Sequence, residues 1–300
     1  MKYQRFSRSI LFVSALVVAS ACTKKVSPPA PPASAPVIPP STPAAPGSLP
    51  PGIDLSKLDE SKRKVFYQVV NREPSACGKG HSLLHSVKND RGCRASFYAV
   101  RYIARLAEGG FSEDEIINKV TDRFRTPRVE TIDLSRAPSK GSPNGRVKLV
   151  EFADYECGHC KEAAKLMGIL LAEYPKELTI YFKHFPLSGH VGSLNAALGA
   201  AGAQKQGKFW EFNDKVWENS DRLVPAVLES IAKEIPGLDF NRWYSDLQTD
   251  EVRSYVLDDR AEGRNLQIHK TPAIYINGRL YTEEPDLAGL KDWIDEELGR

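Results

Sequence analysis

RVKLVEFADYECGHCK, residues 146–161, joins an apolar strand directly to a helix that begins at two cysteines. The apolar run at 147–152 has a length that suits a strand in the middle of a sheet. Cys157 stands where the helix begins, so it faces unpaired backbone N–H groups and the positive end of the helix dipole, which lower a thiol pKa. Cys160 follows one turn later on the same face, close enough to form a disulfide with Cys157. The stretch therefore predicts a redox-active dithiol.

Length and composition limit the function classes. The chain has 300 residues, 41% of them hydrophobic, which is enough for one good core and a second small one. The formal net charge is +3 with both signs interspersed, and no basic stripe indicates a nucleic-acid partner. The five cysteines stand at positions 22, 77, 93, 157 and 160. We expect no cofactor and no metal site.

The N-terminus predicts export from a bacterial cytoplasm. Three basic residues precede an apolar run at 10–18, which is too short to span a bilayer but suits the central part of a signal peptide. We assign the signal peptide to residues 1–21.

Cys22 is the predicted lipidation site. The sequence Ala-Ser-Ala-Cys at 19–22 resembles a bacterial lipobox, in which the cysteine becomes the lipidated first residue of the mature chain. Thr23 resembles the residue that directs lipoproteins to the outer rather than the inner membrane. The expectation is a protein of the periplasm or cell envelope, attached to the membrane through this lipid. Simple cleavage after Ala21, which leaves a soluble periplasmic protein, is the alternative.

Residues 22–53 are predicted to form a tether. The stretch from 26 to 53 is rich in proline and has no charged residue, so it favours extended polyproline II and cannot bury a core. The alternative is a proline-rich ligand for a partner domain.

Residues 54–126 are predicted to form a small helical domain. Amphipathic patterns at 58–70 and 95–106 indicate two helices, which end before Pro74 and at Gly109-Gly110. A capping box over 112–115 begins a third helix that ends near residue 124.

Cys77 and Cys93 flank the loop between the first two of these helices. A small domain gains stability when such a loop is closed, so we predict a structural disulfide. Two alternatives stay open. The pair could act as a redox relay that receives electrons from the catalytic dithiol, or it could bind zinc together with His81 and His85.

Residues 127–300 are predicted to be an α/β domain with a helical insertion at about 190–265. The strand at 178–185 should lie parallel to the central strand, as a right-handed crossover requires. Asn277-Gly278 is a strong hairpin signal. The other expected elements, in chain order, are a strand at 129–134, the helix from Cys157 to 173, hairpin strands at 273–276 and 279–281, and a helix at 287–298.

Four segments carry a family resemblance: FADYECGHCK, KHFPL, AALGAAGAQKQGKFWEFND and TPAIYING. In this order and spacing they resemble the DsbA-like branch of the thioredoxin superfamily, over about residues 129–300. The resemblance implies a thioredoxin fold with a helical insertion, here preceded by a tether and a small all-α domain. It also implies thiol:disulfide exchange with exported proteins that carry cysteine thiols or disulfides, and a redox partner that the sequence does not identify.

The resemblance assigns roles to individual residues. Cys157 matches the exposed attacking cysteine and Cys160 the buried resolving one. Thr271-Pro272 matches the cis-proline loop that faces the disulfide and pairs with the substrate backbone.

Glu151 matches the buried acid that accepts or relays the proton of Cys160. Lys183 is the expected partner for its charge. The alternative is that Glu151 is an exposed acid at the edge of the sheet.

His159 bears on the direction of exchange. Between the two cysteines it can favour the Cys157 thiolate, which stabilises the reduced form and makes the couple more oxidising, toward roughly −180 to −120 mV. The alternative is a surface residue without effect. Thr271 before the cis-proline resembles isomerases and some reductases, so isomerase or reductase activity stays open.

A second function class is a lipid-tethered binding or metal-handling module that retains the fold without turnover. The remaining histidines near the motifs have ordinary interpretations. We expect His184 to pack at a strand end and His190 to stand at a helix entry, whereas His269 could reach the active-site surface and adjust Cys157.

Overall fold

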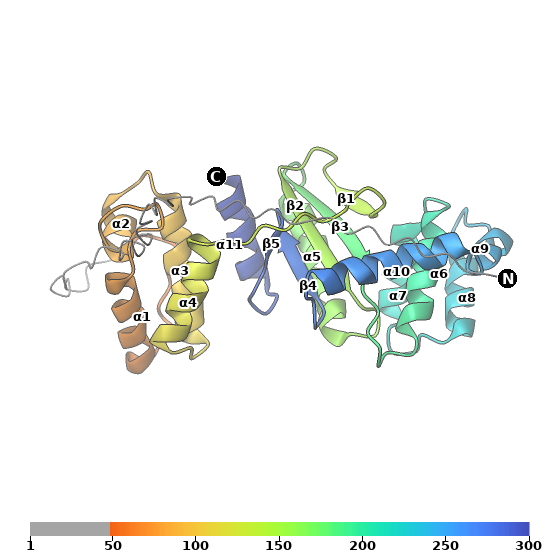
Figure 1. Ribbon diagram of the computed structural model, residues 1–300, viewed down its shortest axis with the longest axis horizontal. Coiled ribbons are helices and arrows are strands. Elements are labelled where there is room, and N and C mark those ends of the chain that lie inside the picture. The colour runs from red at the N-terminus through yellow and green to blue at the C-terminus, as the bar shows by residue number, and fades with distance from the viewer. Residues whose placement is uncertain (1–48, 300) are drawn as a thin grey trace, which may run out of the picture. The chain divides into compact units, whose positions relative to one another are not determined.

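The computed structural model describes residues 49–299 (Figure 1). The predicted signal peptide, Cys22 and most of the predicted tether lie outside the described residues. Within residues 49–299, no helix is both long and apolar enough to cross a membrane.

The first described part of the chain is a small helical domain. Its helices share one apolar core, which includes Phe66, Tyr102 and Ile116. They are α1 (Glu60–Arg72), α2 (Leu83–Asn89), α3 (Arg94–Glu108) and α4 (Glu113–Phe124). Ser112 and Glu115 form the predicted capping box at the start of α4.

Two differences from the sequence expectation concern this domain. The loop expected between the first two long helices contains α2, which Ser82 caps and which buries Leu83 and Leu84 in the core. Leu49 and Ile53, expected in the tether, pack against the same core. We therefore use the term helical domain for residues 49–126.

The second part is built on a five-stranded mixed sheet. Its strands are β1 (Ser139–Gly141), β2 (Val147–Ala153), β3 (Leu178–His184), β4 (Ala273–Ile276) and β5 (Arg279–Leu280). The order across the sheet is β1-β3-β2-β4-β5, with β2 and β3 parallel and the other neighbours antiparallel. The apolar stretch therefore lies at the centre, as its composition predicts.

The strand expected at 129–134 is not formed. Val129 makes one isolated bridge to Arg279, and Glu130 N–H donates to the carbonyl of Gly278. Ile132 and Leu134 instead pack against the apolar cluster on one face of the sheet. Their alternation thus reflects an extended segment that lies on the core. The first strand of the sheet instead pairs at 139–141, where no strand was expected.

Asn277 and Gly278 turn the chain between β4 and β5 with positive φ values of 48° and 80°. A side chain at Gly278 would also meet the carbonyl oxygen of Glu130. This is the two-residue hairpin that the Asn-Gly sequence predicts.

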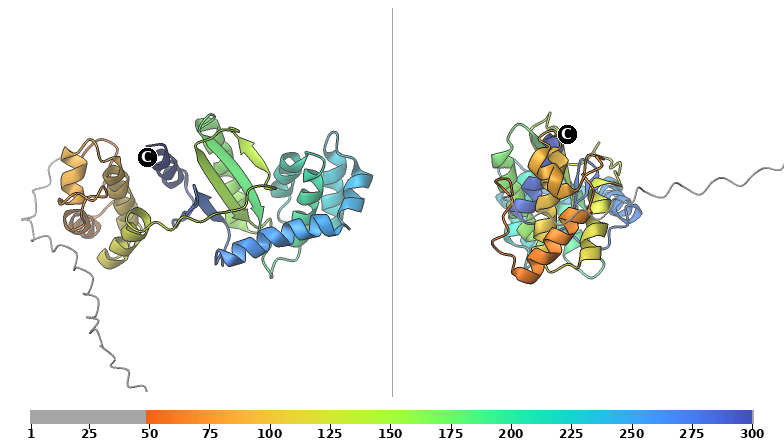
Figure 2. Two further views of the ribbon diagram at one scale, coloured as in Figure 1. Left: turned by 45° about the horizontal axis from the view of Figure 1, so that its top comes forward. Right: turned by 90° about the vertical axis from the view of Figure 1, so that its left-hand side faces the viewer.

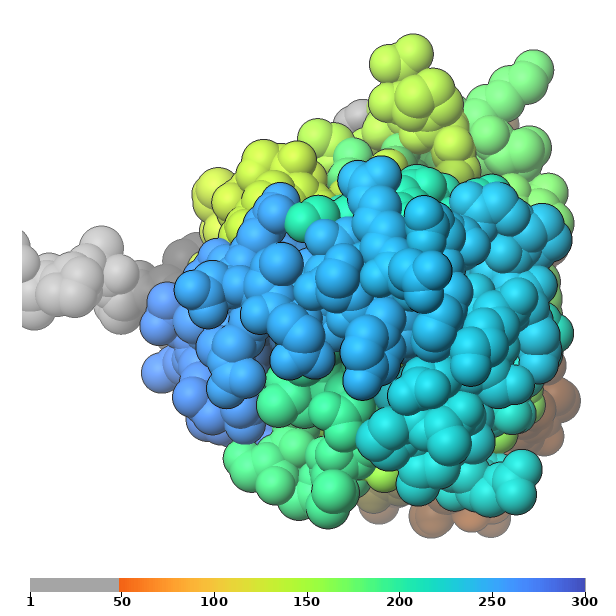
Figure 3. Space-filling view, turned by 90° about the vertical axis from the view of Figure 1, so that its right-hand side faces the viewer, coloured from red at the N-terminus to blue at the C-terminus, as the bar shows by residue number. Residues whose placement is uncertain are grey.

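Helices pack against the sheet, and the inserted helices lie to one side of it (Figure 2). α5 (Gly158–Glu173) and α11 (Leu287–Leu298) share an apolar cluster with β2. The insertion consists of α6 (Ser193–Gln204), α7 (Phe209–Glu218), α8 (Pro225–Glu234), α9 (Phe240–Asp246) and α10 (Asp250–Asn265). The last of these returns the chain to the sheet, and with α8 and α9 it covers the face seen in Figure 3.

The insertion and the helical domain both contact the sheet domain. The insertion core continues to Tyr155 and Cys160, at the start of α5. α11 lies between α3 and the sheet. On the α3 side of α11, Arg101 and Arg105 both pair with Asp292.

Candidate redox site

Cys157 is the N-cap residue of α5, as the sequence predicts. It has extended backbone angles, and its carbonyl accepts hydrogen bonds from the N–H groups of Cys160 and Lys161, at 3.0 and 3.1 Å. Both thiols of the pair are free in this structure. The Cys157 side chain is partly exposed, whereas Cys160 is fully buried. Only the Cys157 sulfur is therefore accessible, either to attack a foreign disulfide or to be attacked by a foreign thiol.

The two thiols differ strongly in acidity. A hydrogen bond from the Cys160 thiol lowers the pKa of Cys157 to about 5, with help from the backbone N–H groups of Cys160 and His159 and against partial burial. Burial raises the pKa of Cys160 well above its usual value. The outer sulfur is thus ionised at neutral pH and the inner one is protonated.

The cis-proline loop faces the outer sulfur. The Thr271–Pro272 peptide bond is cis, and the Cys157 sulfur lies 3.3 Å from the carbonyl oxygen of Thr271. These residues are 114 positions apart in the sequence. The fold therefore places this loop beside the reactive sulfur, as the resemblance implies.

Glu151 lies in the middle of β2, between Phe182 of β3 and Ile274 of β4. It is 3% exposed, which excludes the interpretation as an edge acid. Burial raises its pKa to about 8. Among the described residues, its Oε1 atom has no hydrogen-bond partner, and the side chain borders a cavity of about 190 Å³ that Asn213 and Asp214 also line.

This carboxyl can exchange a proton near neutral pH. Its negative charge contributes to the raised pKa of Cys160, so the two groups interact electrostatically. A protonated Glu151 can give up its proton when Cys160 leaves as a thiolate, and take one when Cys160 must ionise.

Lys183 is not the partner of Glu151. It forms ion pairs with Asp259 at 2.5 Å and Glu262 at 2.9 Å, both on α10. The register explains the error, because Glu151 lies opposite Phe182, whereas Lys183 lies opposite Phe152. Neighbouring positions along a strand point to opposite faces, so Lys183 points away from the α5 side of the sheet.

The turn before Cys157 is held by two acids. Asp154 is fully buried, and its carboxylate accepts from the N–H groups of Glu156 at 2.8 Å and Leu187 at 2.6 Å. Glu156 in turn accepts from the N–H groups of Gly192 and Ser193, at 2.8 and 2.9 Å. The residue next to the nucleophile therefore caps the first helix of the insertion.

His190 was expected to be a helix-entry residue, but it also joins this turn. Its Nδ1 atom lies 2.9 Å from Asp154 Oδ1. This contact with the Asp154 carboxylate raises the pKa of His190, and the charge of Cys157 contributes in the same direction. An imidazole within electrostatic reach of the thiolate is a feature that no local motif indicated.

A groove of about 620 Å³ adjoins the cis-proline loop. We call it the cis-proline groove. One wall is the segment 266–273, and the other is the chain after β4, including residues 280–285. His159 and His269 both line it, and both are exposed. The sequence suggested these two histidines for the active-site surface but not the second wall.

His184 packs at the end of β3, as expected. It is fully buried among aromatic rings, including those of Phe182 and Phe209. Burial lowers its pKa to about 3, so it stays neutral.

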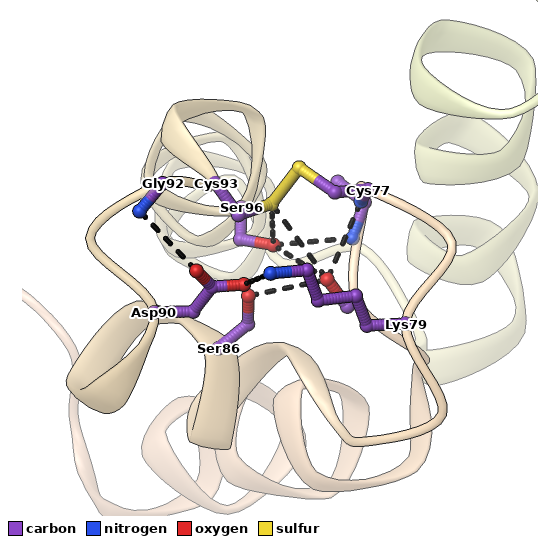
Figure 4. The surroundings of a disulfide bond; sticks show 9 residues. Cys77, Lys79, Ser86, Asp90, Gly92, Cys93 and Ser96 are labelled. Atoms are coloured by element: carbon purple, nitrogen blue, oxygen red, sulfur yellow. Dashed lines mark hydrogen bonds and ion pairs between the residues drawn. A yellow bond between two sulfur atoms is a disulfide. The ribbon is translucent and has the colours of Figure 1, made fainter.

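Cys77 and Cys93 are joined by a disulfide with an S–S distance of 2.00 Å (Figure 4). The Cys93 sulfur is buried at the N-cap of α3, 3.1 Å from the Ser96 hydroxyl, whereas Cys77 is exposed. Because the disulfide uses both sulfurs, the four-ligand zinc set with His81 and His85 is not available. Within residues 49–299, no group of three or more histidine, cysteine or acidic side chains could hold a metal ion.

Comparisons with known proteins agree on the second part of the chain. A family model described as thioredoxin matches residues 135–296. A probable disulfide bond formation protein D from Bacillus anthracis is 31% identical over 193 residues, covering 61% of this chain and 86% of the relative.

Two solved structures are also similar. A thioredoxin-like oxidoreductase from Silicibacter pomeroyi DSS-3 has 28% identity and a TM-score of 0.51, covering 55% of this chain and 94% of its own. The oxidised form of BdbD from Bacillus subtilis has a TM-score of 0.54 at 23% identity, covering 58% of this chain and 99% of its own, and supports the fold alone.

Proposed function

Because the chain belongs to the DsbA-like branch of the thioredoxin superfamily and is a thiol:disulfide oxidoreductase, we propose that it oxidises thiols of exported proteins in a bacterial cell envelope. The observation that supports this direction best is the low pKa of Cys157, at about 5. A sulfur that is stable as a thiolate is a good leaving group, so the reduced enzyme is favoured and electrons flow from the client to the enzyme.

The reaction uses the two sulfurs in sequence. A client thiolate attacks Cys157 in the Cys157–Cys160 disulfide, a bond forms between the client sulfur and Cys157, and Cys160 leaves as a thiolate. Glu151 supplies the proton that Cys160 then needs. A second client thiolate attacks the client sulfur of this mixed disulfide, which forms the client disulfide and releases Cys157 as a thiolate. The client loses two electrons and the enzyme gains them.

The cis-proline loop and the cis-proline groove position the client. The groove beside Thr271 and Pro272 can hold an extended client segment while its sulfur is bonded to Cys157. A separate redox partner then reoxidises the dithiol. No nucleic acid takes part.

A lipid on Cys22 is proposed as the membrane anchor, in the outer rather than the inner membrane. The lipobox-like sequence at 19–22 and the uncharged proline-rich stretch after it support this arrangement. In this case a Cys22→Ser variant of the full chain should be lost from the membrane fraction while the wild-type chain sediments with it. Equal sedimentation of both would contradict the anchor.

The oxidase proposal is tested by refolding. Oxidised protein is mixed with a reduced, unfolded disulfide protein, and recovery of the client's activity is followed. We expect recovery with the wild-type chain and none above background with Cys157→Ser. Equal recovery with both would refute the proposal.

Isomerase or reductase activity is the second candidate, because Thr271 precedes the cis-proline. It would be favoured if the reduced protein recovers a client with wrongly paired disulfides faster than the oxidised protein recovers a reduced client. The equilibrium constant of the Cys157–Cys160 couple in a glutathione buffer separates the two directions independently of any client.

A further inference from the structure

Glu283 ties the helical domain to the segment between β5 and α11. Its carboxylate accepts hydrogen bonds from Arg105 Nε at 2.8 Å and from a terminal nitrogen of Arg123 at 3.1 Å, both in the helical domain. Trp293 Nε1 of α11 donates a further hydrogen bond, at 2.9 Å. The Tyr102 hydroxyl adds a second link 3.3 Å from the Thr282 hydroxyl. Arg105 and Glu283, which are 178 positions apart in the sequence, are thus joined by hydrogen bonds.

These contacts are shielded from water. The side chain of Glu283 is 10% exposed and that of Arg123 is 1% exposed. Arg123 also pairs with Glu296 at 2.8 Å and stacks over the Trp293 ring at 4.1 Å. Removing one partner of a buried charge pair leaves an uncompensated charge, which is strongly unfavourable. The segment at Glu283 therefore has one favoured position while the helical domain is docked.

The same segment is a wall of the cis-proline groove. Residues 282–285 line the groove together with His159 and the Thr271-Pro272 loop. At its solvent side, Lys270 and Glu284 form an ion pair at 3.5 Å in which both side chains are at least 80% exposed. Such an exposed pair is weak and can open for a client, whereas the buried carboxylate next to it holds the wall in place.

We propose, on the premise that clients bind in this groove, that the helical domain takes part in client selection by fixing the groove wall through Glu283. Glu283 is a positioning residue, since it acts through the position of residues 282–285 and not on the sulfur atoms. The helical domain thereby affects the affinity for extended clients and leaves the reactivity of Cys157 toward small thiols unchanged.

The test is Glu283→Gln, which keeps the size of the side chain and removes its charge. Two quantities are measured: the rate of exchange of the Cys157–Cys160 disulfide with glutathione, which does not need the groove, and the KM for a cysteine-containing peptide. We expect the peptide KM to rise roughly tenfold, equivalent to about 1.4 kcal/mol, with the maximal rate and the glutathione rate unchanged within about twofold. Glu108→Gln is the matched control, because within residues 49–299 the Glu108 side chain makes only an exposed ion pair with Lys57, in the same domain.

Direct binding separates this proposal from the oxidase proposal. A peptide with serine in place of cysteine is titrated into the Cys157→Ser protein with and without Glu283→Gln, so that no exchange takes place. Weaker binding in the double variant supports the role of Glu283 even if the direction of exchange is not oxidation. Equal binding overturns it even if the wild-type chain is an oxidase.

Two further outcomes would also overturn the proposal. One is an equal loss of peptide and glutathione rates in a folded Glu283→Gln protein, which would place the effect at Cys157 itself. The other applies if Glu283→Gln fails to fold. Arg105→Lys then replaces it, because lysine keeps the charge but cannot make both Arg105 contacts to Glu283, at 2.8 and 3.3 Å. An unchanged peptide KM in this variant would refute the proposal.

Discussion

The two cysteine pairs both use a helix N-terminus, but in opposite ways. In the α5 pair, the N-cap sulfur of Cys157 is partly exposed and its partner Cys160 is buried three residues later. In the helical domain, the N-cap sulfur of Cys93 is buried and its exposed partner Cys77 comes from a loop 16 residues earlier. A cysteine at a helix start therefore does not by itself make a redox centre. The stabilised sulfur must also be accessible, and its partner must be near on the same helix.

The largest expected difference is in thiol ionisation within the α5 pair. In the reduced protein at pH 6, Cys157 should react with iodoacetamide roughly a thousandfold faster than Cys160, because a thiol with a pKa of 9 or more is at most about 0.1% ionised at that pH. The Cys157 rate should increase as the pH rises through about 5 and then stay constant.

Mass spectrometry of peptides from each cysteine measures both rates. A Cys157 profile with its midpoint near 8.5, the value of a free cysteine, would remove the distinction between the two pairs.

The second prediction concerns the pair in the helical domain. Replacing Cys77 and Cys93 together by alanine should lower the free energy of unfolding by about 3 kcal/mol, the value for closing a loop of this length. Exchange with clients should stay within about twofold of wild type. Urea unfolding and the refolding assay measure the two quantities, and a large loss of exchange in a folded variant would favour the redox relay instead.

The third prediction concerns Glu151, which has no counterpart at the other cysteine pair. Among the described residues, the Cys93 sulfur contacts serine hydroxyls and no buried carboxyl. The folded protein keeps this proton up to about pH 8, whereas the unfolded chain releases it near 4.5, so wild-type stability falls as the pH rises across that window. Glu151→Gln does not titrate. Its stability advantage over wild type should grow by roughly 2 kcal/mol between pH 5 and pH 7.

Denaturant unfolding at several pH values measures this difference. Glu151→Asn, which is smaller and does not titrate either, should show the same growth of the difference with pH. A constant difference between Glu151→Gln and wild type across the window would mean that the carboxyl is ionised in the folded protein.

The smallest expected effect belongs to His159. Its side chain is exposed, and the contribution it makes to the Cys157 pKa comes through its backbone N–H, which alanine retains. His159→Ala should therefore raise the Cys157 pKa by less than about one unit, or less than tenfold in the exchange equilibrium. The alkylation midpoint measures it. A rise of two units or more in the Cys157 pKa would mean that the His159 imidazole is the main group stabilising the thiolate.

Local patterns were sufficient for elements that have their own apolar face and caps. α4 follows directly from its capping box, and the β4–β5 hairpin follows from Asn277-Gly278. α2 was missed because seven residues are too few to show a helical period, and it depends on the burial of Leu83 and Leu84. The strand at 129–134 was wrong because alternation indicates one buried side and does not indicate a pairing partner.

The same limit applies to the site. The cysteine pair and the Thr271-Pro272 loop were predicted because they lie in recognisable segments. The partners of Lys183, Asp154 and Glu283 were not, because each is determined by strand register or by packing between distant helices. A charge pattern along the chain does not contain that information.

The hydrogen bonds from Gly192 and Ser193 to Glu156 have a consequence for engineering. Through these hydrogen bonds, the Glu156 carboxylate, next to Cys157, connects the sheet domain to its inserted helices. Grafting a different insertion onto this scaffold would break this connection unless the graft also offers two backbone N–H donors to Glu156. The reactive turn and the inserted helices should therefore be exchanged together as one cassette.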